Sequence, residues 1–197
     1  MLDIDTLLAW GAVYKKYGPE ETIFQEDGEC RFYHQLVSGS VRWTNFKEDG
    51  GEFIQNMIKP GESFGELPLF DDSPYAATAI TNKESVVIRL HMSSFQQLLK
   101  QSPEICLAFL KLFSERMRFK FLLLKELSCF GPEHRISTLF SYLKKSNGNI
   151  CKENNRMDLT RQQIANMTGL RVETVIRSIR HMNENGQLVI ERGKVYC

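Results

Sequence analysis

Cysteine follows no binding pattern in this chain of 197 residues. The five cysteines are odd in number and far apart, and none belongs to a C-x-x-C pair. This spacing argues against a disulfide framework and against a zinc or iron–sulfur site, so we expect reduced thiols and no bound metal. The four histidines are equally scattered. These cysteines are Cys30, Cys106, Cys129, Cys151 and Cys197.

Long apolar runs are also missing. A membrane-spanning helix needs about 18 or more consecutive apolar residues, and no segment approaches that length. The N-terminal "MLDIDTLLAWG" has neither the basic start nor the apolar run of a signal peptide. We therefore expect a cytoplasmic protein without a membrane partner.

The sequence offers no catalytic constellation. It has no Ser/His/Asp arrangement, no Walker loop and no paired carboxylates with a plausible pocket. We therefore predict that the protein is not an enzyme, with no catalytic residue and no metal ligand.

Charge is distributed unevenly, although the net charge is only +1. Residues 1–131 hold 14 Lys/Arg against 18 Asp/Glu, and residues 132–197 hold 11 against 6. The basic C-terminal third is a candidate nucleic-acid surface, because basic side chains attract phosphates. Charge alone supports this only weakly, since solvated basic faces are common.

From about Glu20 to Leu90 the sequence pattern predicts short strands. "HQLVSGSVRW" and "KEDGGEFIQNMI" each place a glycine turn between apolar-rich segments, and turn signals recur every eight to twelve residues. This pattern predicts a small antiparallel roll or sandwich. The later segments have helical periodicity, so the fold class is α+β.

A long helix is predicted after Ser102-Pro103, up to the break at Gly131-Pro132. Its apolar residues occupy two faces, of which one can cover the roll. We expect the other face to pack against a second copy, as a homodimer, although burial within one monomer is the alternative. The candidate dimer contacts are Phe109, Leu110, Phe113, Met117, Phe121 and Leu124.

The most specific pattern is "LTRQQIANMTGLRVETVIRSIRHMNENG" at 159–186. Thr160 and Gln163 form a capping box, Ala165 is small where two helices cross, and Gly169 permits a tight turn. This spacing predicts a helix-turn-helix whose second helix enters the DNA major groove. "QLVIERGKVYC" follows as a two-stranded wing.

The second helix presents side chains suited to reading bases. Arginine can bind guanine bidentately and glutamate can accept from cytosine, whereas the alternative for Glu173 and Arg177 is a mere surface ion pair. The predicted partner is double-stranded DNA. The candidate DNA-binding residues are Thr160, Arg161, Gln162, Arg171, Glu173, Thr174, Arg177 and Arg180.

Taken in order, "GESFGEL", the long helix, "LTRQQIANMTGLRVETVIR" and the "GK" wing closely resemble the Crp–Fnr superfamily of bacterial transcription regulators. The resemblance covers nearly the whole chain. It implies a cyclic-nucleotide-binding-like β-roll over residues 1–101, a dimerisation helix over 102–130 and a winged helix-turn-helix over 131–197. It also implies regulation at palindromic promoter sites, with RNA polymerase as a further candidate partner.

The resemblance carries over the base-reading pair Glu173 and Arg177. Val172 differs from the cyclic-AMP receptor branch and Ile176 from the Fnr branch, so the half-site is expected to be related to the family's TGA-containing pentamer without being equal to it. The N-terminal cysteine cluster of the Fnr oxygen sensor is absent.

In the family's cyclic-nucleotide binders, "G-E-x-x-G-E-L" is followed by an arginine that neutralises the phosphate. Here Tyr75 stands in place of that arginine. A phenol brings no positive charge to a buried phosphodiester, so cyclic AMP is disfavoured as an effector. The candidate effector-pocket residues are Gly65, Glu66, Leu67, Tyr75, Ala76, Lys120 and Phe121.

Three interpretations of the roll stay open. The loop keeps the shape of the nucleotide cassette as scaffold only, or it binds a different small-molecule effector, or it binds a cyclic nucleotide by altered contacts. The alternative function for the whole chain is a cyclic-nucleotide-responsive protein-interaction module. No cofactor is identified by the residues.

Overall fold

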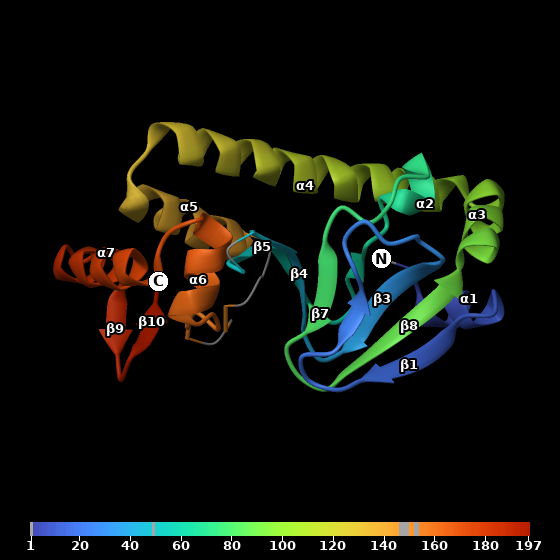
Figure 1. Cartoon of the computed structure of the whole chain (residues 1–197), viewed down its shortest axis with the longest axis horizontal. Helices are drawn as coiled ribbons and strands as arrows, with labels where there is room; N and C mark the ends of the chain where they lie inside the picture. The colour runs from blue at the N-terminus through green and yellow to red at the C-terminus, as the bar shows by residue number, and fades with distance from the viewer. Residues whose placement is uncertain (1, 49, 146–149, 152–153) are drawn as a thin grey trace. The chain divides into compact units, whose positions relative to one another are not determined.

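A computed structural model describes residues 2–48, 50–145, 150–151 and 154–197 of the chain (Figure 1). The chain forms two compact units, Met1–Phe113 and Ser114–Cys197. The long helix α4, Pro103–Cys129, begins in the first unit and ends in the second. It opens with proline at its first position, as "SPE" predicts, and it ends before Gly131-Pro132.

The first unit is a roll of two antiparallel sheets, as the turn pattern predicts. One sheet has the strand order β1-β8-β3-β6 and the other β2-β7-β4-β5. In the antiparallel pairing of β3 with β8, His34 lies opposite Arg89. The strands are β1 Val13–Tyr17, β2 Thr22–Phe24, β3 Phe32–Ser38, β4 Val41–Phe46, β5 Glu52–Ile58, β6 Ser63–Phe64, β7 Thr78–Thr81 and β8 Ser85–His91.

Three short helices accompany the sheets: α1 Ile4–Ala9, α2 Pro68–Asp71 and α3 Met92–Gln101. Helix α3 begins at Met92, where the His91 ring accepts from the Ser93 amide. The first unit's core is aromatic at this end. Tyr33 stacks on Phe95 at 4.9 Å between ring centroids, and Phe109 of α4 meets both rings edge-on.

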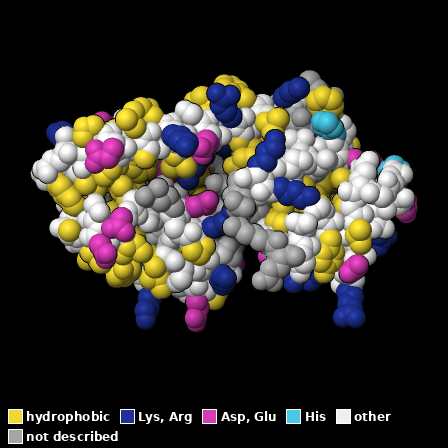
Figure 2. Space-filling view, turned by 180° about the vertical axis from the view of Figure 1, so that it is seen from behind, with side chains coloured by type: hydrophobic (Ala, Val, Ile, Leu, Met, Phe, Trp, Pro, Cys, Tyr) yellow, Lys and Arg dark blue, Asp and Glu magenta, His cyan; other side chains and the backbone are white. Residues whose placement is uncertain are grey.

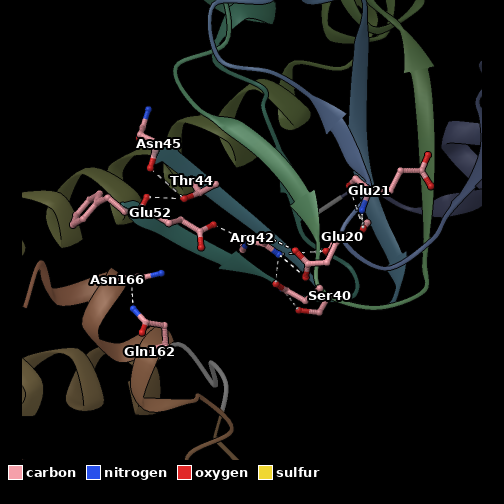
Figure 3. Close-up of polar contacts among 12 residues, drawn as sticks. Glu20, Glu21, Ser40, Arg42, Thr44, Asn45, Glu52, Gln162 and Asn166 are labelled. Atoms are coloured by element: carbon pink, nitrogen blue, oxygen red, sulfur yellow. Dashed lines mark hydrogen bonds and ion pairs between the residues drawn. The ribbon is translucent and has the colours of Figure 1, made fainter. Parts of the chain in front are cut away.

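An ion-pair network closes one side of the second sheet (Figure 3). Arg42 of β4 is largely buried and donates to Glu20 at 2.6 Å and to Glu52 at 2.7 Å. Its guanidinium also donates to Asn82 at 2.9 Å. Because a buried guanidinium is stable only when its donors are satisfied, this network joins three segments distant in sequence.

The second unit contains three helices and a hairpin: α5 Pro132–Lys145, α6 Arg161–Thr168, α7 Val172–Glu184, β9 Val189–Glu191 and β10 Lys194–Tyr196. Leu139 and Ile136 of α5, Ile164 of α6 and Ile179 of α7 are at most 1% exposed and form its core. The hairpin turns at Arg192 and Gly193, both with positive φ, as predicted for the wing.

Helix α4 differs from the predicted division of its faces at Phe109. Phe109 is only 5% exposed and Phe113 packs beside it, within 6.0 Å of its ring and 5.2 Å of the Phe70 ring. Both therefore pack on the roll. The burial of Phe109 contradicts its assignment as a dimer contact, whereas the half-buried Phe113 stays a candidate. The prediction failed for Phe109 because its spacing fits either apolar face.

The other apolar side chains of α4 lie at the surface. In Figure 2 hydrophobic side chains reach the surface along the upper edge, where α4 runs. The exposed ones include Leu107, Leu110, Met117, Phe121 and Leu124, each at least 58% exposed.

Among the described residues, no helix combines the length and apolar character needed to cross a membrane. Within the same residues, no cluster of three His, Cys, Asp or Glu is placed to hold a metal ion. Four of the five cysteines are described there as free thiols, and the side chain of Cys129 lies outside the described set.

Candidate DNA-binding and effector sites

The turn between α6 and α7 is fixed by residues at both ends of α6. The Thr160 hydroxyl accepts from the Gln163 amide at 3.1 Å, and the Gln163 side chain accepts from the Thr160 amide at 2.9 Å. This reciprocal cap satisfies two amides that helix formation leaves open. At the other end Gly169 adopts φ +67° and its amide donates to the Ala165 carbonyl, so the chain reverses within three residues.

Helix α7 has one buried and one exposed face. Val175, Ser178, Ile179 and Met182 are buried, at spacings of three and four residues, and they hold α7 against the other helices of the unit. The opposite face carries Glu173, Ile176, Arg177 and Arg180. The helix therefore holds its charged side chains outward on a rigid support.

Glu173 and Arg177 are not engaged with each other. In the part of the chain that the structure describes, neither side chain forms an ion pair or a hydrogen bond. The surface-pair interpretation therefore finds no support in this geometry. Both side chains keep their full hydrogen-bonding capacity for a ligand on the exposed face.

The remaining candidate DNA-binding residues surround this face. Arg171 is exposed at the N-cap of α7, and Thr174 is half-buried in its first turn. On α6, Gln162 is exposed and donates to Asn166 at 2.9 Å (Figure 3), and Arg161 is half-buried. Thr160 uses its hydroxyl oxygen for the cap, so it acts first as a structural residue.

Two contacts that sequence reasoning missed position α7 and the wing. His181 lies 2.7 Å from Glu133 of α5, and Asn183 accepts from the amide of Ile190 in β9 at 2.9 Å. The first pair is separated by 48 residues. No local pattern links them, so only the tertiary structure could reveal the pair.

The segment that resembles the nucleotide cassette contains a left-handed glycine, Gly65, and we call the space in front of it the cradle. Gly65 has φ +66°, and Glu66 follows it, fully buried, with its carboxylate accepting from the Ser63 hydroxyl at 3.3 Å. Leu67 and Ala76 are exposed, and the Ala76 carbonyl accepts from Asn45.

Two aromatic rings occupy the space in front of Gly65. Tyr75 is 3% exposed and stacks on Phe24 with 3.8 Å between centroids and 9° between planes. A Cβ at Gly65 would meet the Phe24 ring, with Cε1 at 2.7 Å, and would lie 3.1 Å from the Tyr75 ring. The glycine is therefore needed to admit the chain's own rings.

The Tyr75 hydroxyl interacts with the Cys30 thiol. Burial, followed by this hydrogen bond, raises the pKa of Tyr75 far above its usual range, so the phenol stays neutral. Burial also raises the pKa of Cys30. Neither the phenol nor the thiol can supply the positive charge that a bound phosphate needs.

Phe24 is the residue of this site that the sequence analysis missed. It lies in β2, some forty residues before the cradle, and apolar alternation in "ETIF" marks it only as a core position. Lys120 and Phe121, the helical candidates, lie in the second unit. Burial, with a smaller contribution from Arg116, lowers the pKa of Lys120 to about 8, and Phe121 is 64% exposed.

Comparison with known proteins agrees with this arrangement. Residues 14–102 match the family model of the cyclic nucleotide-binding domain, and residues 134–196 match that of the Crp-like helix-turn-helix domain. The cAMP-activated global transcriptional regulator CRP of Haemophilus influenzae is 26% identical over 195 residues, which are 96% of this chain and 87% of that protein.

Solved structures share the fold. FixK2 from Bradyrhizobium japonicum superimposes with a TM-score of 0.80 at 20% identity, over 94% of this chain and 91% of FixK2. The c-di-GMP responsive global regulator CLP of Xanthomonas campestris gives 0.79 at 20% identity, over 98% of this chain and 96% of CLP. The chain belongs to the Crp/Fnr family of non-enzymatic, DNA-binding transcriptional regulators, with a cyclic nucleotide-binding domain followed by a Crp-like helix-turn-helix domain.

Proposed function

We propose that this protein is a homodimeric regulator that reads palindromic promoter sites with α7 and that its roll does not bind cyclic AMP in the usual way. The observation that carries the first part is the outward face of α7, where Glu173 and Arg177 project without partners among the described residues. A guanidinium and a carboxylate held on a rigid helix can read guanine and cytosine edges in the major groove.

The candidate DNA-binding residues divide into two roles. Glu173 and Arg177 supply the base contacts, with Thr174 and Arg180 beside them. The residues that fix the helix on the sugar–phosphate backbone are Thr160, Arg161, Gln162 and Arg171, because they flank the N-terminal ends of α6 and α7, where positive side chains and amides suit phosphate.

Dimerisation through α4 is supported by the apolar side chains that this helix leaves exposed. Leu110, Met117, Phe121 and Leu124 recur at three, four and seven residues and are 58–64% exposed. Helices with such a stripe gain free energy by packing against an identical helix about a two-fold axis. A dimer of this kind presents two recognition helices to two half-sites. Residues 1–101, 102–130 and 131–197 are then the effector, dimerisation and DNA-binding segments.

The second part rests on the filled cradle. A phosphate at Gly65 would have to displace the Phe24–Tyr75 stack and would meet no arginine at position 75. Removing a phosphodiester from water without a cation is unfavourable by several kcal/mol, on the order of the cost of burying other unpaired polar groups. An effector of different chemistry is compatible with the roll, and RNA polymerase is the partner that a promoter-bound dimer would contact.

The experiment is selection of bound sites from random double-stranded DNA with the intact protein, followed by affinity measurements on the selected site. Arg177→Ala should weaken that site by about 1–3 kcal/mol and relax the preference at one base pair. Arg177→Lys tests the fork, because lysine keeps the charge and loses the bidentate geometry.

Arg31→Ala is the matched control, since it removes an arginine charge from the first unit, where Arg31 is exposed and paired with Glu29. It should leave affinity and preference unchanged. Failure to select any sequence, or an unchanged preference in Arg177→Ala, would overturn the proposed function.

A further inference from the structure

Among the residues that the structure describes, the guanidinium of Arg89 on the inner face of the first sheet forms no ion pair. Arg89 of β8 lies opposite His34 of β3 in the antiparallel register, so both side chains project from the same face. The His34 ring lies 5.4 Å from Phe24 of the other sheet and 5.6 Å from Phe64. That face is therefore the interior of the roll.

Polar atoms of both residues are buried without hydrogen bonds. Within the described residues, Arg89 Nε and His34 Nδ1 have no partner, although His34 is only 4% exposed. An unsatisfied buried donor or acceptor costs about 1–3 kcal/mol, and such atoms in a native protein mark a missing partner.

Two cations, Arg89 and Lys15, act on the ring of His34. Burial lowers its pKa to about 3, with further lowering by Arg89 and then Lys15, so the ring is neutral at physiological pH. Lys15 lies at the exposed rim, with its Nζ 4.6 Å from the Tyr17 ring centre. The inner face thus offers one half-buried guanidinium, one neutral ring and a second cation at the edge.

The apolar surroundings fit a flat ligand body. The Arg89 guanidinium lies over the Phe32 ring at 4.6 Å, and Phe32 and Arg89 are both half-buried, which gives solvent access at this end of the roll. Phe32 also lies within 6.3 Å of the His34 ring. A single half-buried guanidinium matches a monoanion and its fork matches a carboxylate, whereas a phosphate dianion would need more donors.

We propose that Arg89 and His34 form an effector site for a small carboxylate with a flat apolar body, with Arg89 binding the carboxylate bidentately and Phe32 contacting the body. This proposal rests on the proposed function only in taking the roll as a sensor domain. The site adjoins the cradle at Gly65, because His34 packs against Phe24 and Phe64, but its ligand-binding groups lie on β3 and β8 and include none of the cassette residues.

The test uses the intact protein without DNA and benzoate as the probe. Benzoate should raise the thermal unfolding temperature in a saturable way and shift the Arg89 Nε–H resonance, since a ligand bound only by the native state stabilises it. Benzamide has the same shape without charge and should do neither. Inorganic phosphate should act more weakly than benzoate.

Variants locate the site. Arg89→Gln should lower benzoate affinity at least about tenfold, because a charge-assisted hydrogen bond is lost. Arg89→Lys should retain weakened binding and guards against misfolding of the glutamine variant. Lys16→Gln is the matched control, because the Lys16 side chain points to the opposite face of β1 from its neighbour Lys15. This variant should bind benzoate like the wild type.

The proposal is overturned if benzoate gives no saturable shift, if Arg89→Gln binds it unchanged, or if benzamide or phosphate acts as strongly. A protein that does not bind DNA could still bind benzoate in this titration. A failed benzoate titration would not change the outcome of the selection of DNA sites. The two proposals therefore fail separately.

Discussion

The molecule contains two motifs built around a left-handed glycine, and they are used in opposite ways. Gly169, at φ +67°, reverses the chain so that α7 holds its polar face outward. Gly65, at φ +66°, opens a space that Phe24 and Tyr75 fill from within. A left-handed glycine can therefore serve two different ends, and the side chains packed against it decide whether the space beside it can bind a ligand.

The largest expected effect tests whether Tyr75 is part of the core. Tyr75→Ala should lower the free energy of unfolding by about 3–5 kcal/mol, because it removes a buried ring stacked on Phe24. Chemical denaturation measures this. Tyr14→Ala, on an exposed tyrosine of the same unit, should cost about 0.5 kcal/mol. Equal losses of unfolding free energy in the two variants would mean that Tyr75 is not packed in the core.

The next effect compares two glycines of nearly equal φ. Gly65→Ala should destabilise by about 2–4 kcal/mol, through backbone strain and a clash with the Phe24 ring. Gly186→Ala, at φ +68° with open space around it, should show only the strain, about 1–2 kcal/mol. Denaturation of both variants isolates the clash, and a Gly65 cost no larger than that of Gly186 would contradict the filled cradle.

A pH effect follows from His34. Its folded pKa of about 3 lies below the ordinary 6.5, so protons bind the unfolded chain first as the pH falls. The stability that the neutral ring contributes is fully present above about pH 6.5 and is lost as the pH falls toward 3. Unfolding free energies measured across this range should fall more steeply in the wild type than in His34→Gln. Parallel slopes would show that His34 is not buried as a neutral ring.

The smallest effect concerns the helix-turn-helix. Thr160→Ala should cost about 1 kcal/mol of stability, since the Gln163 amide loses its partner. Thr160→Ser keeps the hydroxyl and should be near the wild type. Thermal unfolding of both variants measures this difference. An alanine variant as stable as the serine variant would contradict a stabilising role for the Thr160 cap.

The sequence predicted the parts whose causes are local. The capping box, the turn at Gly169, the proline start of α4 and the wing at Arg192 and Gly193 are each specified by residues a few positions apart, and each is present. Chain order and motif spacing were enough for the family.

Packing between residues far apart in the chain could not be predicted from the sequence. Nothing near Gly65 reveals that Phe24 fills its cradle, and apolar spacing alone could not decide which face of α4 takes Phe109. The opposition of His34 and Arg89 depends on strand register, which brings together residues more than fifty positions apart.

We propose that this protein keeps the DNA-binding unit of its family and that its own side chains fill the nucleotide cradle. Thermal unfolding of the intact protein with saturating cyclic AMP or cyclic GMP tests it most directly, with Glu66→Ala as the companion variant. Neither nucleotide should change the unfolding temperature of either protein. A clear rise in the wild type that disappears in Glu66→Ala would contradict this proposal.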